Sequence, residues 1–339
     1  MIKTSQCPQC GAPFVWDVTQ QCMKCDSCGY TQEAQMHQHD SEEAEMSMMT
    51  CTTCGAQIEA KEHTIATMCP YCSNTVLITE NMQNERRPKC VVPFSLTLDQ
   101  AKDLITKYLK RRYLRPTTFK LSQVKDNTRM EYIPFWLLSS QTKAHVVIHG
   151  TKSTRHEHGD TVTVTTKHYD LHRDLDVKFV RIPVDASIEM DDDIMDRLEP
   201  FDYSKLMSFT PDYLAGCIAE GYDYTAEDLS ERYEKRVSEA VMDYAVSAST
   251  AGYGVEGKHF ESKSINVYGK EYTLLPVYTI EYEDKENKRR KRKHKIFVNG
   301  QTGLVVADVP VSMFKTVKIG AIVAGVVSAI SLIVNMVIL

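Results

Sequence analysis

The chain lacks the short motifs that assign many proteins to an enzyme class at once. Its 339 residues contain no G-x4-G-K-[ST] phosphate loop, no G-x-S-x-G nucleophile turn and no H-E-x-x-H zinc motif. A basic excess is also missing, because the formal net charge is −5, whereas nucleic-acid-binding proteins usually carry many extra cations. We therefore expect no enzyme, and we expect nucleic acid to be a less favoured partner than protein.

The amino terminus lacks a long apolar run. MIKTSQCPQC has no stretch resembling a secretory signal, which predicts a reducing cytoplasmic location for this end and no structural disulfides. The overall composition, 42% hydrophobic and 25% charged, is that of a globular protein and excludes collagen-like, disordered and multi-span membrane classes. The mean hydropathy of −0.33 agrees with a chain that is mostly soluble.

What the chain does contain is cysteine, concentrated at one end. Nine of its eleven cysteines precede residue 75, and eight of them form C-x-x-C pairs. Adding 44 to each position of the first four-cysteine set gives the second set, so the region is a tandem repeat. Cys22 falls outside this register and is not expected to be a ligand. The eight predicted ligands are Cys7, Cys10, Cys25 and Cys28, followed by Cys51, Cys54, Cys69 and Cys72.

Paired C-x-x-C turns of this kind are typical of zinc ribbons. Each unit has too few residues to fold on apolar burial alone, so we expect two structural zinc ions to supply most of the folding free energy. The predicted organisation is a first ribbon over 1–35, a polar linker over 36–49 and a second ribbon over 50–80. Redox chemistry of the pairs, or chance, are the competing interpretations. Four protein ligands would leave no open position, so zinc catalysis is not expected.

The charge of the ribbon region argues against phosphate binding. Residues 1–80 contain three lysines against ten acidic residues, a formal charge of −7. A phosphate-binding surface needs the opposite sign, so the ribbons favour protein contacts over nucleic acid.

Residues 90–313 have the composition of a folded α+β body. Thr97 to Arg112 predicts a helix that begins with a Thr…Gln capping box, and a second helix is predicted from Thr225 to about Ser249. Alternating segments predict two antiparallel β blocks, and similar motifs at their ends suggest a duplicated β unit. The predicted strands are Ile133–Ser139, Ala144–His149, Thr161–Tyr169 and Val177–Ile182 in the first block, and Tyr272–Tyr282, Lys295–Asn299 and Leu304–Asp308 in the second.

Candidate sites in the body are weaker. His156 and His158 could hold a metal at a hairpin tip, but solvated side chains are the favoured interpretation. Asp191–Asp193 could bind a hard cation, although acidic residues in a first helical turn also interact with the helix dipole, which we favour. Cys217 lies in an apolar context and is expected to be buried rather than nucleophilic. The sequence assigns no role to Cys90.

The last segment, 319–339, contains no charged residue. As a helix it would span about 30 Å, the thickness of a bilayer core, so we predict a single transmembrane helix, with a buried core helix as the alternative. Lys315 and Lys318 precede it, which predicts a cell-membrane protein with the bulk of its chain in the cytoplasm. Small residues four apart suit this helix to forming homo- or hetero-oligomers.

A basic run, KENKRRKRKHK, lies about two dozen residues before that helix. A solvated turn and attraction to anionic lipid headgroups are equally favoured interpretations, and nucleic acid is third. The residues predicted to contact lipid are Lys288, Arg289, Arg290, Lys291, Arg292, Lys293 and Lys295.

Several segments together resemble the bacterial TFIIB-type double zinc-ribbon, membrane-anchored proteins of the YdjG-like family. They are CPQCGAPF, CTTCGAQI with CPYC, YIPFWLL, MDRLEPFDYSKL, YLAGCIAEGYD and VNGQTGLVVADVPVS. The resemblance implies a fold of class α+β, with two tandem ribbons, a mixed antiparallel-sheet body and one carboxyl-terminal transmembrane helix. It also implies association with PspA-like and SPFH-domain membrane proteins, and it assigns roles only to the eight ribbon cysteines.

The sequence thus favours a non-enzymatic, membrane-anchored adaptor that recruits cytosolic partners to the inner face of the bacterial membrane, in membrane-stress or membrane-organisation assemblies. The alternative is a membrane-tethered nucleic-acid-binding protein, related to replication or transcription, that uses Lys285–Lys295.

Overall fold

The computed structural model describes residues 2–33, 49–58, 60, 63–113, 127–158, 161–284, 292–307, 309 and 311–338. Most of the predicted linker and most of the basic run, including Lys288, Arg289, Arg290 and Lys291, lie outside these residues. The α+β fold class is confirmed, with a sheet body, two cysteine tetrads at ribbon-like positions and one apolar carboxyl-terminal helix.

Most of the strands join one sheet. This sheet has 11 strands. Eight of them follow one another in the order β1-β8-β7-β13-β10-β14-β15-β16. Of the other three, β11 pairs with β10, β9 pairs with β14, and β12 pairs with β9. The strands of this sheet are β1 (Ile2–Thr4), β7 (Thr64–Met68), β8 (Thr75–Ile78), β9 (Cys90–Val91), β10 (Thr128–His158), β11 (Thr161–Asp185), β12 (Met207–Ser208), β13 (Ile218–Glu220), β14 (Gly254–Asp284), β15 (Arg292–Asn299) and β16 (Val305–Ala307).

The remaining strands form two small sheets, and short helices connect the larger elements. The small sheets are β2-β3-β4 and β5-β6. Their strands are β2 (Val15–Asp17), β3 (Cys22–Lys24), β4 (Thr31–Gln32), β5 (Met49–Thr50) and β6 (Gln57–Ile58). The helices are η1 (Thr79–Met82), η2 (Asn84–Arg86), α1 (Leu98–Lys110), α3 (Asp192–Arg197), η3 (Tyr203–Lys205), η4 (Pro211–Leu214), α4 (Ser230–Ser249) and α5 (Met313–Ile338).

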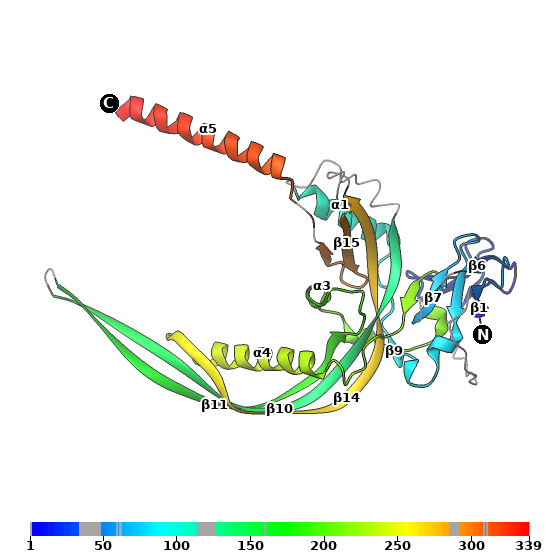
Figure 1. Ribbon diagram of the computed structural model, residues 1–339, viewed down its shortest axis with the longest axis horizontal. Helices are drawn as coiled ribbons and strands as arrows, with labels where there is room; N and C mark the ends of the chain where they lie inside the picture. The colour runs from blue at the N-terminus through cyan, green and yellow to red at the C-terminus, as the bar shows by residue number, and fades with distance from the viewer. Residues whose placement is uncertain are drawn as a thin grey trace.

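Three long strands, β10, β11 and β14, form a long curved part of the large sheet (Figure 1). The prediction of four short strands in the first β block was wrong in its boundaries, because the first two segments lie in β10 and the last two in β11. The polar residues between the segments do not end the strands. They are accommodated by register shifts, such as the one between Ser139 and Ser140, and by long exposed stretches of β11.

The similar motifs that begin the two β blocks pair with each other. Ile133 of β10 lies opposite Leu275 of β14, and Pro134 lies opposite Leu274. The carbonyl groups of the two prolines remain available as acceptors: Pro134 accepts from the Ala186 N–H and Pro276 from the Gly300 N–H. The two similar motifs therefore lie opposite each other near one end of the β10–β14 pairing.

Helix α1 begins with the predicted capping box. The Thr97 hydroxyl accepts from the Gln100 N–H at 3.3 Å, and the Gln100 side chain accepts from the Thr97 N–H at 2.8 Å. Ala101, Ile105 and Leu109 form the buried face of the helix. These reciprocal bonds satisfy donors that a helix start otherwise leaves unpaired.

Helix α4 lies on the concave side of the curved sheet (Figure 1). Its buried face, which includes Tyr233, Val237 and Val241, packs in one cluster with Val146 and Ile148 of β10. Because side chains alternate along a strand, the neighbouring residues of β10 point to the convex side. The two faces of this part of the sheet therefore differ: the concave face forms a core with α4, and the convex face carries exposed residues such as Lys143 and His149.

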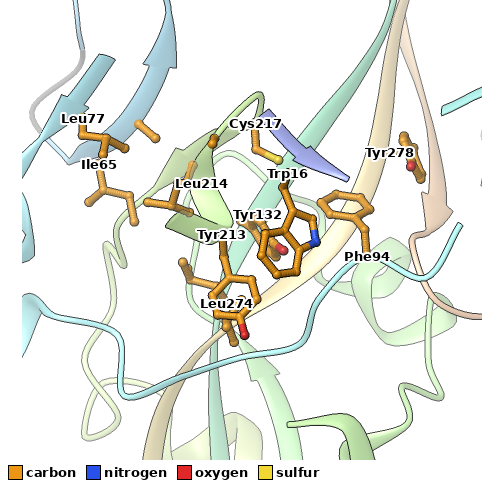
Figure 2. Close-up of a cluster of buried hydrophobic side chains, with 14 of the residues drawn as sticks. Trp16, Ile65, Leu77, Phe94, Tyr132, Tyr213, Leu214, Cys217, Leu274 and Tyr278 are labelled. Atoms are coloured by element: carbon orange, nitrogen blue, oxygen red, sulfur yellow. The ribbon is translucent and has the colours of Figure 1, made fainter. Parts of the chain in front are cut away.

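The two cysteine-containing ribbons share a hydrophobic core with the body. The Trp16 ring of β2 packs against Tyr213 with ring centroids 4.6 Å apart, and the backbone N–H of Trp16 donates to the Ala215 carbonyl at 3.2 Å. Figure 2 shows Trp16 beside Tyr132 and Phe94, and the same cluster includes Ile65 and Leu77 from the second ribbon. Strand β7 also pairs with β13 of the body. Ribbons and body are thus joined through one core and one sheet.

Candidate metal centres

The structure brings the eight predicted cysteines together as two tetrads. Within each tetrad one ligand atom per residue lies within 4.8 Å of every other. The short Sγ···Sγ contacts follow the sequence repeat: Cys7 to Cys28 and Cys10 to Cys25 are 3.5 Å apart, and the equivalent pairs of the second tetrad, Cys51 to Cys72 and Cys54 to Cys69, are 3.7 Å apart. All eight cysteines are free of disulfides.

These separations fit a tetrahedral metal ion. Sulfur atoms held about 2.3 Å from a central zinc ion lie about 3.8 Å from one another. The first cysteine of each C-x-x-C pair is buried and the second is more exposed, so each centre lies at the edge of the core. Each tetrad can hold a metal ion, and its all-thiolate donor set is consistent with zinc.

All four C-x-x-C turns have the same backbone hydrogen bonds. The first cysteine donates its N–H to the residue five positions on, and its carbonyl accepts from the residue four positions on. The residue four positions after the first cysteine has a φ of 73° at Gly11, 76° at Gly29 and 75° at Gly55, but 57° at Ser73. The left-handed conformation is easy for glycine and strained for serine. The fourth turn is therefore the strained one.

Replacing Ser73 by glycine should stabilise the second ribbon. Relief of the left-handed backbone is worth about 1 kcal/mol, less part of the extra entropy that glycine has in the unfolded chain. Gly29→Ala is the matched opposite change, because no heavy atom lies within 4 Å of the added methyl group and only backbone strain is introduced. Urea unfolding of the zinc-loaded variants should show a higher free energy of unfolding for Ser73→Gly and a lower one for Gly29→Ala. A fall for both would contradict the strain argument.

Two of the turns also stabilise the thiolate form of their first cysteine, Cys25 and Cys51. Burial raises the pKa of Cys51, but the N–H groups of Cys54 and Thr53 point at its sulfur, and the net effect lowers the pKa to about 7. Cys25 has the same arrangement with Cys28 and Ser27, and its pKa is also about 7. Because thiolate is the form that binds metal, these turns favour metal binding at neutral pH.

The three cysteines outside the tetrads are explained by their surroundings. Cys22 is partly exposed and joins neither tetrad, as the register of the repeat predicts. Cys217 is fully buried, and burial raises its pKa, so it is an inert core thiol. Burial likewise raises the pKa of Cys90, which lies half-buried at the start of β9.

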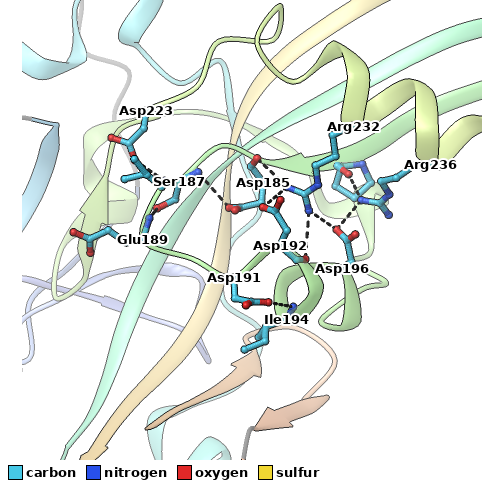
Figure 3. A network of polar contacts seen from close by, with 12 residues as sticks. Asp185, Ser187, Glu189, Asp191, Asp192, Ile194, Asp196, Asp223, Arg232 and Arg236 are labelled. Carbon is cyan, nitrogen blue, oxygen red and sulfur yellow. Dashed lines mark hydrogen bonds and ion pairs between the residues drawn. The ribbon is translucent and has the colours of Figure 1, made fainter. Parts of the chain in front are cut away.

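Asp191–Asp193 have the structural role that the sequence favoured. The Asp191 carboxylate caps α3 by accepting from the Ile194 N–H at 3.1 Å. Asp192 accepts from Arg232 at 2.6 Å, as Figure 3 shows, so its charge is already paired. His156 and His158 are exposed near the end of β10 and belong to none of the candidate metal groups found in the described part of the chain.

A third group of metal-ligating side chains was missed by sequence reasoning. His145, His172 and Glu261 present ligand atoms within 4.8 Å of one another. They come from three different strands, and no local spacing relates them. Only the antiparallel pairing of β10 with β11 and β14 brings them together.

Helix α5 has the length and composition to cross a membrane. The qualifying stretch is Met313–Ser331, and none of the hydrophobic window within it is buried. Its exposed apolar residues include Ile319, Ile322 and Val326, and the helix extends away from the body (Figure 1). Lys315 and Lys318 lie in its first turns. Of the predicted lipid contacts, Arg292, Lys293 and Lys295 belong to β15.

Comparison with known proteins identifies a relative over almost the whole length. The protein named "Uncharacterized protein YdjG" from Bacillus subtilis (strain 168) is 31% identical over 333 residues, which cover 93% of this chain and 92% of YdjG. No family model matches the chain, and no solved structure matches it. Because the identity extends over almost the whole of both chains, the chain belongs to the same family as YdjG.

Proposed function

We propose that the protein is a membrane-anchored adaptor with two structural zinc ions, and that it recruits cytosolic partners to the inner face of the bacterial membrane. The observation that carries the proposal is the contrast between α5, which is apolar and not packed on the body, and the remainder, which is a folded polar assembly. An exposed apolar helix of this length is costly in water and favourable in a bilayer.

The zinc ions have a structural role in this proposal. Each tetrad uses four cysteines, which leaves no position for a water or substrate at the metal. Their effect is to hold the ribbons in shape against the shared core around Trp16 and Tyr213. The ribbons and the body would then present one rigid surface to a partner.

The partners that we propose are membrane-associated proteins of the PspA-like and SPFH-domain kinds, on the family resemblance. The acidic ribbon region favours a partner surface with basic residues, because opposite charges speed and orient association. Affinity purification from cross-linked membranes tests this directly. Enrichment of such proteins with the full chain supports the proposal, and recovery of no membrane-associated partner contradicts it.

Removing residues 313–339 should move the protein from the membrane fraction to the soluble fraction. The reason is that burial of each apolar side chain of α5 in lipid contributes to membrane partitioning, and no other described helix has this character. A matched control replaces 319–338 with an unrelated apolar helix of equal length, which should restore membrane partitioning. Membrane retention of the truncated chain after a high-salt wash would refute an anchor role for α5.

A further inference from the structure

The convex face of the long sheet carries a group of histidines and carboxylates around Val147. His145 lies opposite Asp174, and Val147 lies opposite His172, in the β10–β11 pairing. Directly opposed residues in an antiparallel pair share a face, so these side chains point away from α4. Residues on the other face, such as Ala144 and Val146, are packed against α4. The histidines are thus gathered on the side that the core does not use.

The contacts around His145 have the geometry of a metal-ligand set. Its Nε2 lies 3.2 Å from Nδ1 of His172 and 3.0 Å from a carboxylate oxygen of Glu261. Ligand atoms about 2.0–2.1 Å from a tetrahedral zinc ion lie about 3.3 Å apart, so small adjustments would place one ion among all three. Two imidazoles and one carboxylate are a donor set that suits zinc and neighbouring transition metals.

A further carboxylate fixes the orientation of His145. Asp174 lies 2.6 Å from Nδ1 of His145, on the opposite side of the ring from the shared Nε2. This arrangement assigns the proton to Nδ1 and leaves Nε2 free to bind a metal, as in carboxylate–histidine–metal sites.

A bulge in β14 delivers Glu261. Ser262 lies opposite His145 and Phe260 lies opposite Val146, which leaves Glu261 as an extra residue between them. Such an extra residue redirects a side chain, and bulges are frequent beside functional sites. A depression of about 430 Å³ lies next to His145 and is lined by His145, Asp174 and Ser262 among others.

We propose that His145, His172 and Glu261 form a third metal site, which binds a divalent transition ion such as Zn²⁺ on the convex face, with Asp174 as a positioning residue. Unlike the tetrads, the site has three protein ligands and an open fourth position. It joins the three longest strands by a metal bridge, and its occupancy would respond to the concentration of available metal. The proposal does not depend on the adaptor function.

The test uses the untagged full chain in detergent, with the tetrads loaded with zinc. Equilibrium dialysis against micromolar free Zn²⁺, followed by metal analysis, should find three zinc ions per chain. His145→Ala and His172→Ala should each reduce the count to two at that concentration, and Asp174→Asn should weaken the third site by about tenfold. His172 and Asp174 are exposed, and His145, which is 25% exposed, lies outside the buried core, so the variants should keep the fold and the two tetrad ions.

The matched control is His149→Ala. His149 lies on the same face and pairs with Asp170 at 2.6 Å, but it belongs to none of the three-ligand groups found in the described part of the chain. This variant should keep the third zinc ion.

Addition of Co²⁺ to the zinc-loaded chain should give weak visible bands without the intense near-ultraviolet absorption of cobalt thiolate. A zinc count of two in the intact chain, or a third ion unaffected by His145→Ala, would overturn the proposal.

Discussion

Replacing Cys51 and Cys54 together by serine should remove one of the two zinc ions held by the cysteine tetrads and unfold more than the second ribbon. The double variant leaves Cys69 and Cys72 with no complete ligand set, and zinc binding in such units contributes on the order of 10 kcal/mol to folding. Strands β7 and β8 of this ribbon lie between β1 and β13 in the large sheet, so their loss exposes the body's edge.

The effect should therefore appear in the body as well as in the metal count. Ile65, Ala66 and Leu77 of this ribbon belong to the same buried cluster as Tyr132 and Tyr213. Amide hydrogen exchange should show faster exchange in β13 and in the first residues of β10, in addition to β7. The measurement pairs elemental analysis with exchange on the same sample.

Cys22→Ser is the control, because Cys22 lies outside the tetrads and its loss should change stability by less than about 0.5 kcal/mol. A single zinc ion in the unaltered chain would contradict the repeat. If the double variant showed faster amide exchange only in the second ribbon, the result would contradict a core shared with the body.

Replacing Arg236 by methionine should cost about 3 kcal/mol of folding stability at pH 8. Arg236 donates to both carboxylate oxygens of Glu199 at 2.9 Å and to Asp196 at 3.1 Å. The side chains of Arg236 and Glu199 are only 22% and 20% exposed. Without the guanidinium group, Glu199 would retain a charge in a poorly solvated place.

The loss should be smaller at acidic pH. Burial already raises the pKa of Glu199, against the opposing effect of Arg236, so removal of the arginine raises this pKa further. A carboxyl group whose pKa is raised by folding destabilises the native state at pH above that pKa, and protonation removes the penalty as pH falls. Chemical denaturation of the variant and the parent at pH 5 and pH 8 measures this difference.

Two further variants make the experiment decisive. Arg155→Met removes an ion pair with Glu157 in which both side chains are more than 60% exposed, and it should have almost no effect on stability. Adding Glu199→Gln to Arg236→Met should recover part of the loss, because the buried charge is gone. Equal losses for Arg155→Met and Arg236→Met would contradict the account of a half-buried ion network.

The neighbouring Asp185 shows why such networks escape sequence reasoning. It is 1% exposed, and burial raises its pKa to about 7, although Arg232 opposes the shift. Asp185 ends β11 while Arg232 lies in α4, and Arg232 also binds Asp192 and Asp196 of α3 (Figure 3). In the sequence, Asp191–Asp193 are only a run of acidic residues; the cationic partner of Asp192 follows 40 positions later.

The sequence by itself determined the features that depend on local spacing. The C-x-x-C turns, the capping box at Thr97 and the apolar character of α5 are each specified within a few residues or one helix, so their physics could be predicted directly. Strand boundaries were less predictable, because polar residues within β10 are accommodated by bulges and by a solvent-exposed face.

Only the tertiary structure decided how these pieces combine. Sheet pairing brings His145, His172 and Glu261 into contact across three strands, and it joins the second ribbon to β13 of the body. Both outcomes depend on strand register, in which a shift of one residue moves every side chain to the opposite face. Register between distant strands is selected by the packing of the whole core, including Trp16 against Tyr213 and α4 against β10, and no local pattern contains that information.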